Sequence, residues 1–424
     1  IEFASLSERY TGEKHDGRIP PEMWEMSGWY DHNDIQLVMN DDWKLREYFR
    51  KGCLDQQRLS NPRSFDASET LMHQKHASTF IEHNGAIATE HHSAHAAAAL
   101  MTRPKDWSRS DCVCVVIDGI GEFRSAGVYN SELELVWEMT FPKSIGYLYA
   151  TFTDLCGLGL RSNNDEYVVM GLSSYGEPTH WKGLYEIFQD IEQWDLKDVG
   201  VRTVSMPKGA NVYDYKLHHL KTMVKYLQDN CKSVEDQAAS LQRMTTEVIL
   251  DVMRVARKFG SKLCYSGGVA QNIVSNGEVS ELFDDMWVDV NPGDGGASLG
   301  AAGFQLFKDT GIDRLDWEHP FHGFDIEGDL DPERVVAHLL RHKVCGVANG
   351  RAEFSYRAYG NRSLIADVRY DVKDTVNEIK QRQKFRPFAP AILEEHASDY
   401  FSGAMNQWMQ YCAKSNHPYS SVTH

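Results

Sequence analysis

An uninterrupted apolar run at residues 111–118, with the sequence DCVCVVID, limits what this chain can fold into more than any other segment. Its cysteine, valine and isoleucine residues show no polar alternation, which is typical of a strand buried on both faces. Sheets with such strands are covered by helices on both sides. Because strand-like and helix-like segments alternate along the rest of the chain, we expect an α/β fold.

Other strands are predicted around this run. The sequence DGIGE at residues 118–122 predicts a tight turn, after which residues 125–130 and 133–141 read as an antiparallel meander. Residues 262–266 and 286–290 predict two more short strands. A glycine-rich turn and a helix follow each of these two strands.

A long helix is predicted over residues 233–259. The sequence SVED supplies an amino-terminal cap, and Gly260 ends the helix. Its apolar stripe consists of Ala238, Leu241, Met244, Val248, Val252, Val255 and Ala256.

Residues 90–100, EHHSAHAAAAL, predict a second helix, because alanine has the highest helix propensity. His91 and His95 are four positions apart and therefore lie one above the other on one face, whereas His92 points elsewhere. Asp118 ends the predicted strand at 111–118, and Asp294 lies in a glycine-rich turn. Open sheets place ligand groups at such positions.

Two imidazoles and two carboxylates would together form a site suited to iron(II), manganese or zinc. The alternative is a partly buried histidine pair that backbone groups and solvent satisfy. Spacing alone leaves both interpretations open, because the carboxylates are remote in sequence.

Three glycine-rich turns indicate a second activity. They are DGIGE, SGGVAQN at residues 266–272 and NPGDGG at residues 291–296, and each follows a predicted strand. Glycine permits close approach of the backbone, so N–H groups can point at a phosphate. Three such turns favour nucleotide binding, although any one of them alone is compatible with a plain turn.

A chain of 424 residues favours two domains. The acidic, loop-like segment at residues 312–332 is the best boundary, and we place the domains at 1–322 and 323–424. The sequence begins inside an apparent strand and ends without a cap, so we expect both domains to be incomplete.

The net charge of −17 disfavours nucleic acid as a partner, except through a local basic patch. One cluster is a candidate patch or a solvated face: Arg46, Arg50, Lys51, Arg58 and Arg63. The eight cysteines form no CxxC pair, which favours a reducing cytoplasm. Cys112 and Cys114 could contact a metal or lie in a buried strand. No apolar run approaches the roughly eighteen residues of a membrane span.

Seven segments occur in the order expected of one family: HHSAH, VVIDGIGE, DEYVVMGLSSYGEP, CYSGGVAQN, NPGDGGASLGAA, GRAEFSYRAYGNRSLIAD and IKQRQKFRPFAP. The chain resembles the O-carbamoyltransferase family, which includes nodulation-factor and antibiotic carbamoyltransferases. The resemblance implies a duplicated actin-like ATPase (ribonuclease H-like) domain followed by a YrdC-like α/β domain. It also implies that carbamoyl phosphate and ATP form a carbamoyl-adenylate in the second domain. The carbamoyl group would then pass to a substrate hydroxyl at a metal site in the first domain.

The resemblance implies a role for several residues of the first domain. The expected metal ligands are His91, His95, Asp118 and Asp294, with iron(II) preferred over manganese or zinc. The expected nucleotide-binding residues are Gly267, Gly268 and Asn272 for the adenosine, and Gly119 and Gly121 for the phosphates.

The second domain is expected to bind anions through arginine and lysine, since guanidinium groups match phosphate oxygens. Lys380 and Arg382 would face the same way in an extended segment. The candidates are Lys380, Arg382, Arg386, Arg357, Asn361 and Arg362. Of these, Lys380, Arg382 and Arg357 are expected to be catalytic. The alternative is a set of structural salt bridges, such as Glu353 with Arg357 if that segment is helical.

The sequence departs from the family pattern in several places. Val168 stands where relatives usually have lysine, which weakens the expectation of nucleotide phosphate contacts, and Ser173 and Ser174 replace alanine and proline. The segment near Ser355 and Tyr356 is also altered. A divergent branch, for example a viral one acting in the host cytoplasm, would show such changes.

The acceptor is left open between three classes of function. They are transfer to a small hydroxylated molecule, transfer to a hydroxymethylated base or tRNA, and an inactive binding module. Residues 195–219 form an insert that is the candidate acceptor region. The oligomeric state is not readable from the sequence.

Overall fold

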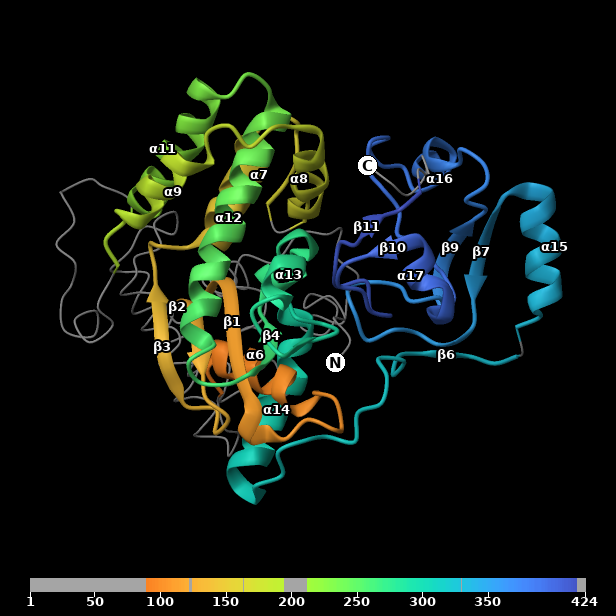
Figure 1. Ribbon diagram of the computed structural model, residues 1–424, viewed down its shortest axis with the longest axis horizontal. Coiled ribbons are helices and arrows are strands. Elements are labelled where there is room, and N and C mark those ends of the chain that lie inside the picture. Colours follow the sequence, from red (N-terminus) through yellow and green to blue (C-terminus); the bar gives the residue numbers. More distant parts are fainter. Residues whose placement is uncertain (1–88, 122–123, 163, 194–211, 329, 418–424) are drawn as a thin grey trace, which may run out of the picture. The chain divides into compact units, whose positions relative to one another are not determined.

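The computed structural model describes residues 89–121, 124–162, 164–193, 212–328 and 330–417 (Figure 1). Apart from residues 212–216, at the start of one helix, the described residues belong to a single compact unit made of residues 89–196 and 217–424. The predicted domain boundary after residue 322 lies within this unit and stays a prediction. The basic cluster at Arg46, Arg50, Lys51, Arg58 and Arg63 lies outside the described residues, as does most of the 195–219 insert.

A five-stranded mixed sheet forms the centre of the fold, in the order β3-β2-β1-β4-β5. Strands β1, β4 and β5 are parallel, and β2 and β3 are antiparallel to their neighbours. The strands are β1 (Cys112–Gly121), β2 (Arg124–Tyr129), β3 (Leu135–Thr140), β4 (Lys262–Ser266) and β5 (Asp285–Val288). With helices on both faces, this sheet confirms the predicted α/β class.

Strand β1 is buried on both faces, as its composition predicts. Val113, Val115 and Ile117 pack into one apolar core, together with residues of α7 and α12. Cys112 and Cys114 point to the opposite face and pack with residues of α6 and α14. The two cysteines are therefore part of the apolar interior, which is the simpler of the two roles that we considered for them.

The helices of the sheet-containing part cover its two faces (Figure 1). Helices α6 and α14 contribute to the core on one face, and the longer helices contribute to the core on the other. The helices are α6 (His91–Met101), α7 (Ile145–Leu155), α8 (Glu166–Leu172), α9 (Trp181–Gln189), α11 (Val212–Asn230), α12 (Val234–Ala256), α13 (Ile273–Ser280) and α14 (Asp294–Thr310). Short 3₁₀ turns occur at η1 (Arg109–Asp111), η2 (Ser173–Tyr175) and η3 (Gly268–Gln271).

Most predicted elements lie within a few residues of the observed ones. Ser233 caps α12, because its side chain accepts a hydrogen bond from the Asp236 N–H. The predicted turn at residues 118–122 is wrong, since β1 continues to Gly121 with an irregular register after Ile117. Gly121 permits this continuation: a Cβ there would lie 2.6 Å from the His91 ring.

The carboxyl-terminal residues form three small two-stranded sheets and three helices. The strand pairs are β6 (Asp325–Ile326) with β8 (Gly350–Arg351), β7 (Val344–Ala348) with β9 (Arg362–Ala366), and β10 (Phe401–Ser402) with β11 (Lys414–Ser415). The helices are α15 (Pro332–His342), α16 (Lys373–Ile379) and α17 (Ala397–Tyr400), and η4 (Glu394–His396) is a 3₁₀ turn. Among the described residues, no helix has the length and apolar character that a membrane span requires.

Candidate metal centre

Two imidazoles project from the same face of helix α6 toward one place. The Nε2 atoms of His91 and His95 lie 3.1 Å apart, one helical turn from each other. His95 is fully buried, and His91 is partly exposed at the start of the helix. The predicted stacking of the two side chains on one helix face is therefore observed.

Two carboxylates from other elements face these imidazoles. Asp118 Oδ2, on the irregular part of β1, lies 3.1 Å from His91 Nε2 and 3.3 Å from His95 Nε2. Asp294, the first residue of α14, places Oδ1 3.5 Å from each of these nitrogens. The other oxygen of Asp118 accepts a hydrogen bond from the Gly119 N–H at 2.7 Å, which fixes the orientation of the carboxylate.

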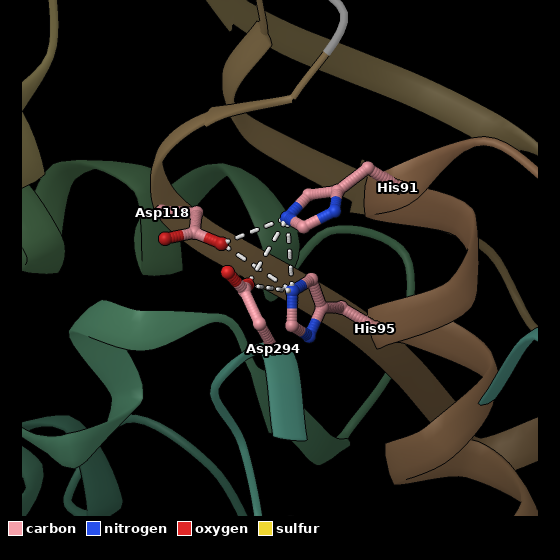
Figure 2. A group of neighbouring side chains, drawn as sticks. All are labelled: His91, His95, Asp118 and Asp294. Atoms are coloured by element: carbon pink, nitrogen blue, oxygen red, sulfur yellow. Dashed lines mark hydrogen bonds and ion pairs between the residues drawn. The ribbon is translucent and has the colours of Figure 1, made fainter. Parts of the chain in front are cut away.

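The four side chains, which we call the His–Asp cluster, offer ligand atoms that all lie within 4.8 Å of one another (Figure 2). Ligand atoms about 2.1 Å from one cation are separated by about 3.0 to 3.4 Å in octahedral or tetrahedral geometry. The five separations that involve a histidine nitrogen are 3.1 to 3.5 Å, which is close to these values. The donor set therefore fits a single divalent cation.

The protonation of the imidazoles and that of the carboxylates in the cluster depend on one another. Burial disfavours the imidazolium form of His95, but hydrogen bonds to Asp118 and Asp294 outweigh it and raise the pKa of His95 to about 9. Burial acts to raise the pKa of Asp118, yet the two imidazoles hold it well below its usual range. At neutral pH His95 therefore carries a proton that faces the carboxylates, and a divalent cation can replace that proton.

His92, which the helical spacing places off the ligand face, belongs to the interior. It is fully buried, and neither ring nitrogen has a hydrogen-bond partner among the described residues. Burial lowers the pKa of His92 well below its ordinary value, so the ring is neutral.

The predicted nucleotide-binding glycines lie around the cluster, where they allow close packing. Gly267 has a φ of 92°, and a Cβ there would lie 2.4 Å from the Ile117 carbonyl oxygen. A Cβ at Gly268 would lie 3.0 Å from Asp118 Oδ1, whereas one at Gly119 would make only an ordinary contact with Tyr147. Nucleotide binding by these turns stays a prediction.

Asn272 has a structural role in the described residues. Its Oδ1 accepts a hydrogen bond from the Ser275 N–H and caps α13. Its side-chain amide also exchanges two hydrogen bonds of 3.0 Å with the buried Gln242. Any contact of Asn272 with adenosine would therefore have to replace or share these bonds.

Three predicted anion-binding residues lie near one another in the carboxyl-terminal segment, so that their charges affect the pKa of Lys380 and Arg382. We call Lys380, Arg382 and Arg386 the basic loop. Burial, followed by the charge of Arg386, lowers the pKa of Arg382 to about 10. Burial and the charges of both arginines lower the pKa of Lys380. The segment is not extended as expected, because α16 ends at Ile379 and Gln381 has a φ of 50°. A turn, and not a strand, brings the cations together.

Arg386 stacks on a side chain from the sheet-containing part of the chain. Its guanidinium carbon lies 4.2 Å from the centre of the Tyr167 ring, and its NH1 donates to the Tyr167 hydroxyl at 3.0 Å. Tyr175, from the same motif, donates to the Phe385 carbonyl. Val168 is fully buried in the apolar core.

The remaining predicted anion-binding residues differ in whether their side chains already have hydrogen-bond partners within the protein. Arg362 donates to four carbonyl oxygens, and the Asn361 amide donates to the Arg351 carbonyl. The Nε of Arg357 is buried without a hydrogen-bond partner. The conditional prediction of a Glu353–Arg357 helical pair is wrong, because the segment is not helical and Glu353 accepts backbone N–H groups of Tyr359 and Asn361.

Two residues that lie near the cluster were not predicted from the sequence as site residues. Ser266 lies beside His95, and the buried carboxylate of Asp289 lies beside Ser266. Burial raises the pKa of Asp289 to about 6. An acidic residue within the apolar strand MWVDV was the available signal, since buried carboxylates need a specific partner.

Comparisons with known proteins agree with the motifs. The family model described as "Carbamoyltransferase N-terminus" matches residues 63–303, and "Carbamoyltransferase C-terminus" matches residues 336–424. Nodulation protein NolO of Bradyrhizobium diazoefficiens is 31% identical over 343 residues, which are 73% of this chain and 59% of that protein. Nodulation protein U of Sinorhizobium fredii is 27% identical over 361 residues, covering 78% of this chain and 63% of that protein.

A third relative is an uncharacterized protein of Synechocystis, 31% identical over 352 residues. The match covers 74% of this chain and 56% of the relative. The chain thus spans between about half and two thirds of the length of the curated relatives it matches.

Proposed function

The chain belongs to the carbamoyltransferase family, and we propose that it acts as an O-carbamoyltransferase that uses ATP, carbamoyl phosphate and a divalent cation. Carbamoyl phosphate, ATP and water would give a carbamoyl-adenylate with release of pyrophosphate and phosphate. The carbamoyl group would then pass to a substrate hydroxyl, and AMP would leave.

The observation that carries this proposal is the His–Asp cluster. Its four side chains come from three separate elements, and the separations that involve their imidazole nitrogens suit a single cation. A cation held there would act as a Lewis acid toward the carbamoyl oxygen or the acceptor hydroxyl. Mixed imidazole and carboxylate ligands suit iron(II), with manganese and zinc as alternatives.

The basic loop supports the proposal for the first half-reaction. ATP and carbamoyl phosphate are anions, and the neighbouring positive charges that lower the pKa of Lys380 and Arg382 attract an anionic ligand. We assign phosphate binding to Lys380, Arg382 and Arg386, and carbamoyl phosphate contact to Arg357, whose buried Nε has no hydrogen-bond partner. Arg362 and Asn361 would support this region by shaping its backbone.

For the acceptor we propose a small hydroxylated molecule. The net charge of −17 repels a polyanion such as tRNA. A nucleic-acid acceptor would instead give binding that weakens steeply as the salt concentration rises.

Two substitutions in the full-length protein test whether the half-reactions occupy separate centres. We expect His95→Ala to abolish metal binding and acceptor carbamoylation while leaving pyrophosphate release largely intact, because the basic loop is unchanged. His338→Ala is the matched control. The ring centroids of His338 and His342 lie 4.5 Å apart at the same helical spacing, and neither ring joins a carboxylate-containing cluster among the residues that the structure describes.

Arg382→Ala should have the converse effect: pyrophosphate release falls and metal content is unchanged. The assay combines ATP, carbamoyl phosphate and iron(II), manganese or zinc, with pyrophosphate as the readout. Absence of pyrophosphate with every metal would reject the enzymatic proposal in favour of a binding module. Loss of both half-reactions in both variants would reject the separation of the two centres.

A further inference from the structure

The ring nitrogen of His95 that points away from the cluster faces a buried hydroxyl. His95 Nδ1 lies 3.5 Å from Ser266 Oγ, at the end of β4. Both side chains have no solvent exposure. The hydroxyl is therefore the partner that the described residues offer to this nitrogen.

Ser266 in turn faces two oxygen atoms that can only accept hydrogen bonds. Its Oγ lies 3.2 Å from the Pro292 carbonyl oxygen and 3.5 Å from Asp289 Oδ2. A serine hydroxyl has one proton and two lone pairs. If that proton is donated to either acceptor, a lone pair remains for an N–H on His95 Nδ1.

Asp289 is itself held in place by backbone contacts. Its Oδ1 accepts the Asn291 N–H at 3.2 Å, and its own N–H donates to the Tyr265 carbonyl at 3.0 Å. Only 1% of its surface is exposed. The side chain of Gln410 donates to the Asp289 carbonyl, which adds a contact from the carboxyl-terminal segment.

We propose that Ser266 and Asp289 are positioning residues that keep the proton of His95 on Nδ1 and direct the lone pair of Nε2 into the His–Asp cluster. A histidine can bind a cation through one nitrogen only when that nitrogen carries no proton. The other ring nitrogen of a metal-bound histidine usually donates to a carboxylate, a carbonyl or water. In this protein a serine hydroxyl would link the imidazole to either the Asp289 carboxylate or the Pro292 carbonyl.

This inference rests on the proposed metal site, and the test uses metal affinity as its readout. Ser266→Ala and Asp289→Asn in the full-length protein should each weaken Co²⁺ binding by about 10- to 100-fold, as for other partners of metal-bound histidines. Ser266→Thr keeps the hydroxyl and should retain most of the affinity. Affinities are measured by competition with a chelator on proteins shown to be folded by circular dichroism.

Ser125→Ala is the matched control. Ser125 is also a fully buried serine on the same sheet, but its hydroxyl contacts the Met139 and Lys143 carbonyls and no imidazole. We expect its Co²⁺ affinity to equal that of the parent protein. Equal losses in Ser125→Ala and Ser266→Ala would reduce the effect to general destabilisation and overturn the inference.

A spectroscopic measurement gives a second, independent readout. In the Zn²⁺-loaded parent protein with ¹⁵N-labelled histidine, we expect His95 to show a metal-bound Nε2 and a protonated Nδ1. Coordination through Nδ1, or unchanged Co²⁺ affinity in Ser266→Ala, would overturn the positioning role while leaving the metal site intact. A parent protein that binds neither Co²⁺ nor Zn²⁺ would overturn the metal site, and the positioning role with it.

Discussion

At the scale of single residues, two arginines that the sequence predicts to bind anions have different surroundings. The guanidinium group of Arg362 donates to the carbonyl oxygens of Phe324, Asn349, Gly350 and Asn361. Arg382 contacts Asn377, makes a 3.3 Å contact with the Pro387 carbonyl and stacks on Phe388. Arg362 therefore fits a structural role, and Arg382, beside other cations, fits an anion-binding role.

This difference predicts opposite outcomes for two alanine substitutions. Arg362→Ala should lower the free energy of unfolding by about 1–3 kcal/mol, because four carbonyl groups, three of them in partly buried contacts, lose a charged donor. Arg382→Ala should instead lower pyrophosphate release at least about tenfold, since a charge-assisted contact to phosphate is lost. Denaturant unfolding and the pyrophosphate assay separate the two effects. The assignment fails if Arg362→Ala loses activity at unchanged stability.

The protonation of His95 predicts how metal affinity depends on pH. In the metal-free protein the pKa of His95 is about 9, so at neutral pH a cation must displace its proton. The apparent affinity for Co²⁺ should therefore rise with pH by about tenfold per unit and level off near pH 9. Chelator competition at constant ionic strength measures this dependence. A flat profile between pH 6 and 9 would contradict the proton displacement.

At the scale of elements, the contact between α6 and α14 sets the spacing of three of the four ligands. His91 and His95 lie on α6, and Asp294 starts α14. A Cβ at Gly300 would lie 1.8 Å from the Ala94 carbonyl oxygen, so the two helix backbones touch. The alanine-rich sequence of α6 therefore provides both helix propensity and a thin surface that α14 can approach.

Gly300→Ala should separate these helices. Its added methyl group meets backbone, which cannot rotate away, so we expect a loss of about 1–3 kcal/mol or more in the free energy of unfolding. We also expect weaker Co²⁺ binding, since the ligands move with their helices. Gly303→Ala is the control on the same helix, because its Cβ would lie 3.1 Å from the Met101 side chain. If both variants retain parental metal affinity, helix contact does not set the ligand spacing.

At the scale of the whole molecule, the carboxyl-terminal segment covers the outer edge of the sheet. Gln410, which is fully buried, donates to the Val288 and Asp289 carbonyls, and the Tyr411 hydroxyl donates to the Met286 carbonyl. The Ser355 hydroxyl donates to the Val290 carbonyl. An uncovered edge strand presents unpaired backbone groups, so these side chains protect β5 and the loop that leads from it to Asp294.

Gln410→Ala should weaken this attachment. We expect the free energy of unfolding to fall by about 1–3 kcal/mol, because two buried carbonyl groups lose their donor. Hydrogen exchange should increase in β5 and in residues 406–411. The exposed Gln407, three positions earlier, provides the control as Gln407→Ala, which should leave exchange unchanged. Parental exchange in Gln410→Ala would show that other contacts hold the segment.

Some of this architecture follows from local sequence alone. The run at 111–118 predicts a doubly buried strand, the cap and stripe of α12 predict that helix, and the spacing of His91 and His95 predicts their stacking. These features depend on periods of two or 3.6 residues and on capping, which a short segment contains in full. The errors occur where a tertiary neighbour decides the conformation. Gly121 remains in β1, for example, because the His91 ring packs against it.

The sequence by itself determined that this chain has buried strands, acidic residues close to glycine-rich segments, and a helix with paired imidazoles. Only the tertiary structure decided that Asp118 and Asp294 meet those imidazoles, and that Ser266 and Asp289 lie behind His95. The physical reason is that β1, β4 and β5 are parallel neighbours, so residues more than a hundred positions apart in sequence end at the same edge of the sheet. That adjacency arises from packing across the whole chain, and no local pattern encodes it.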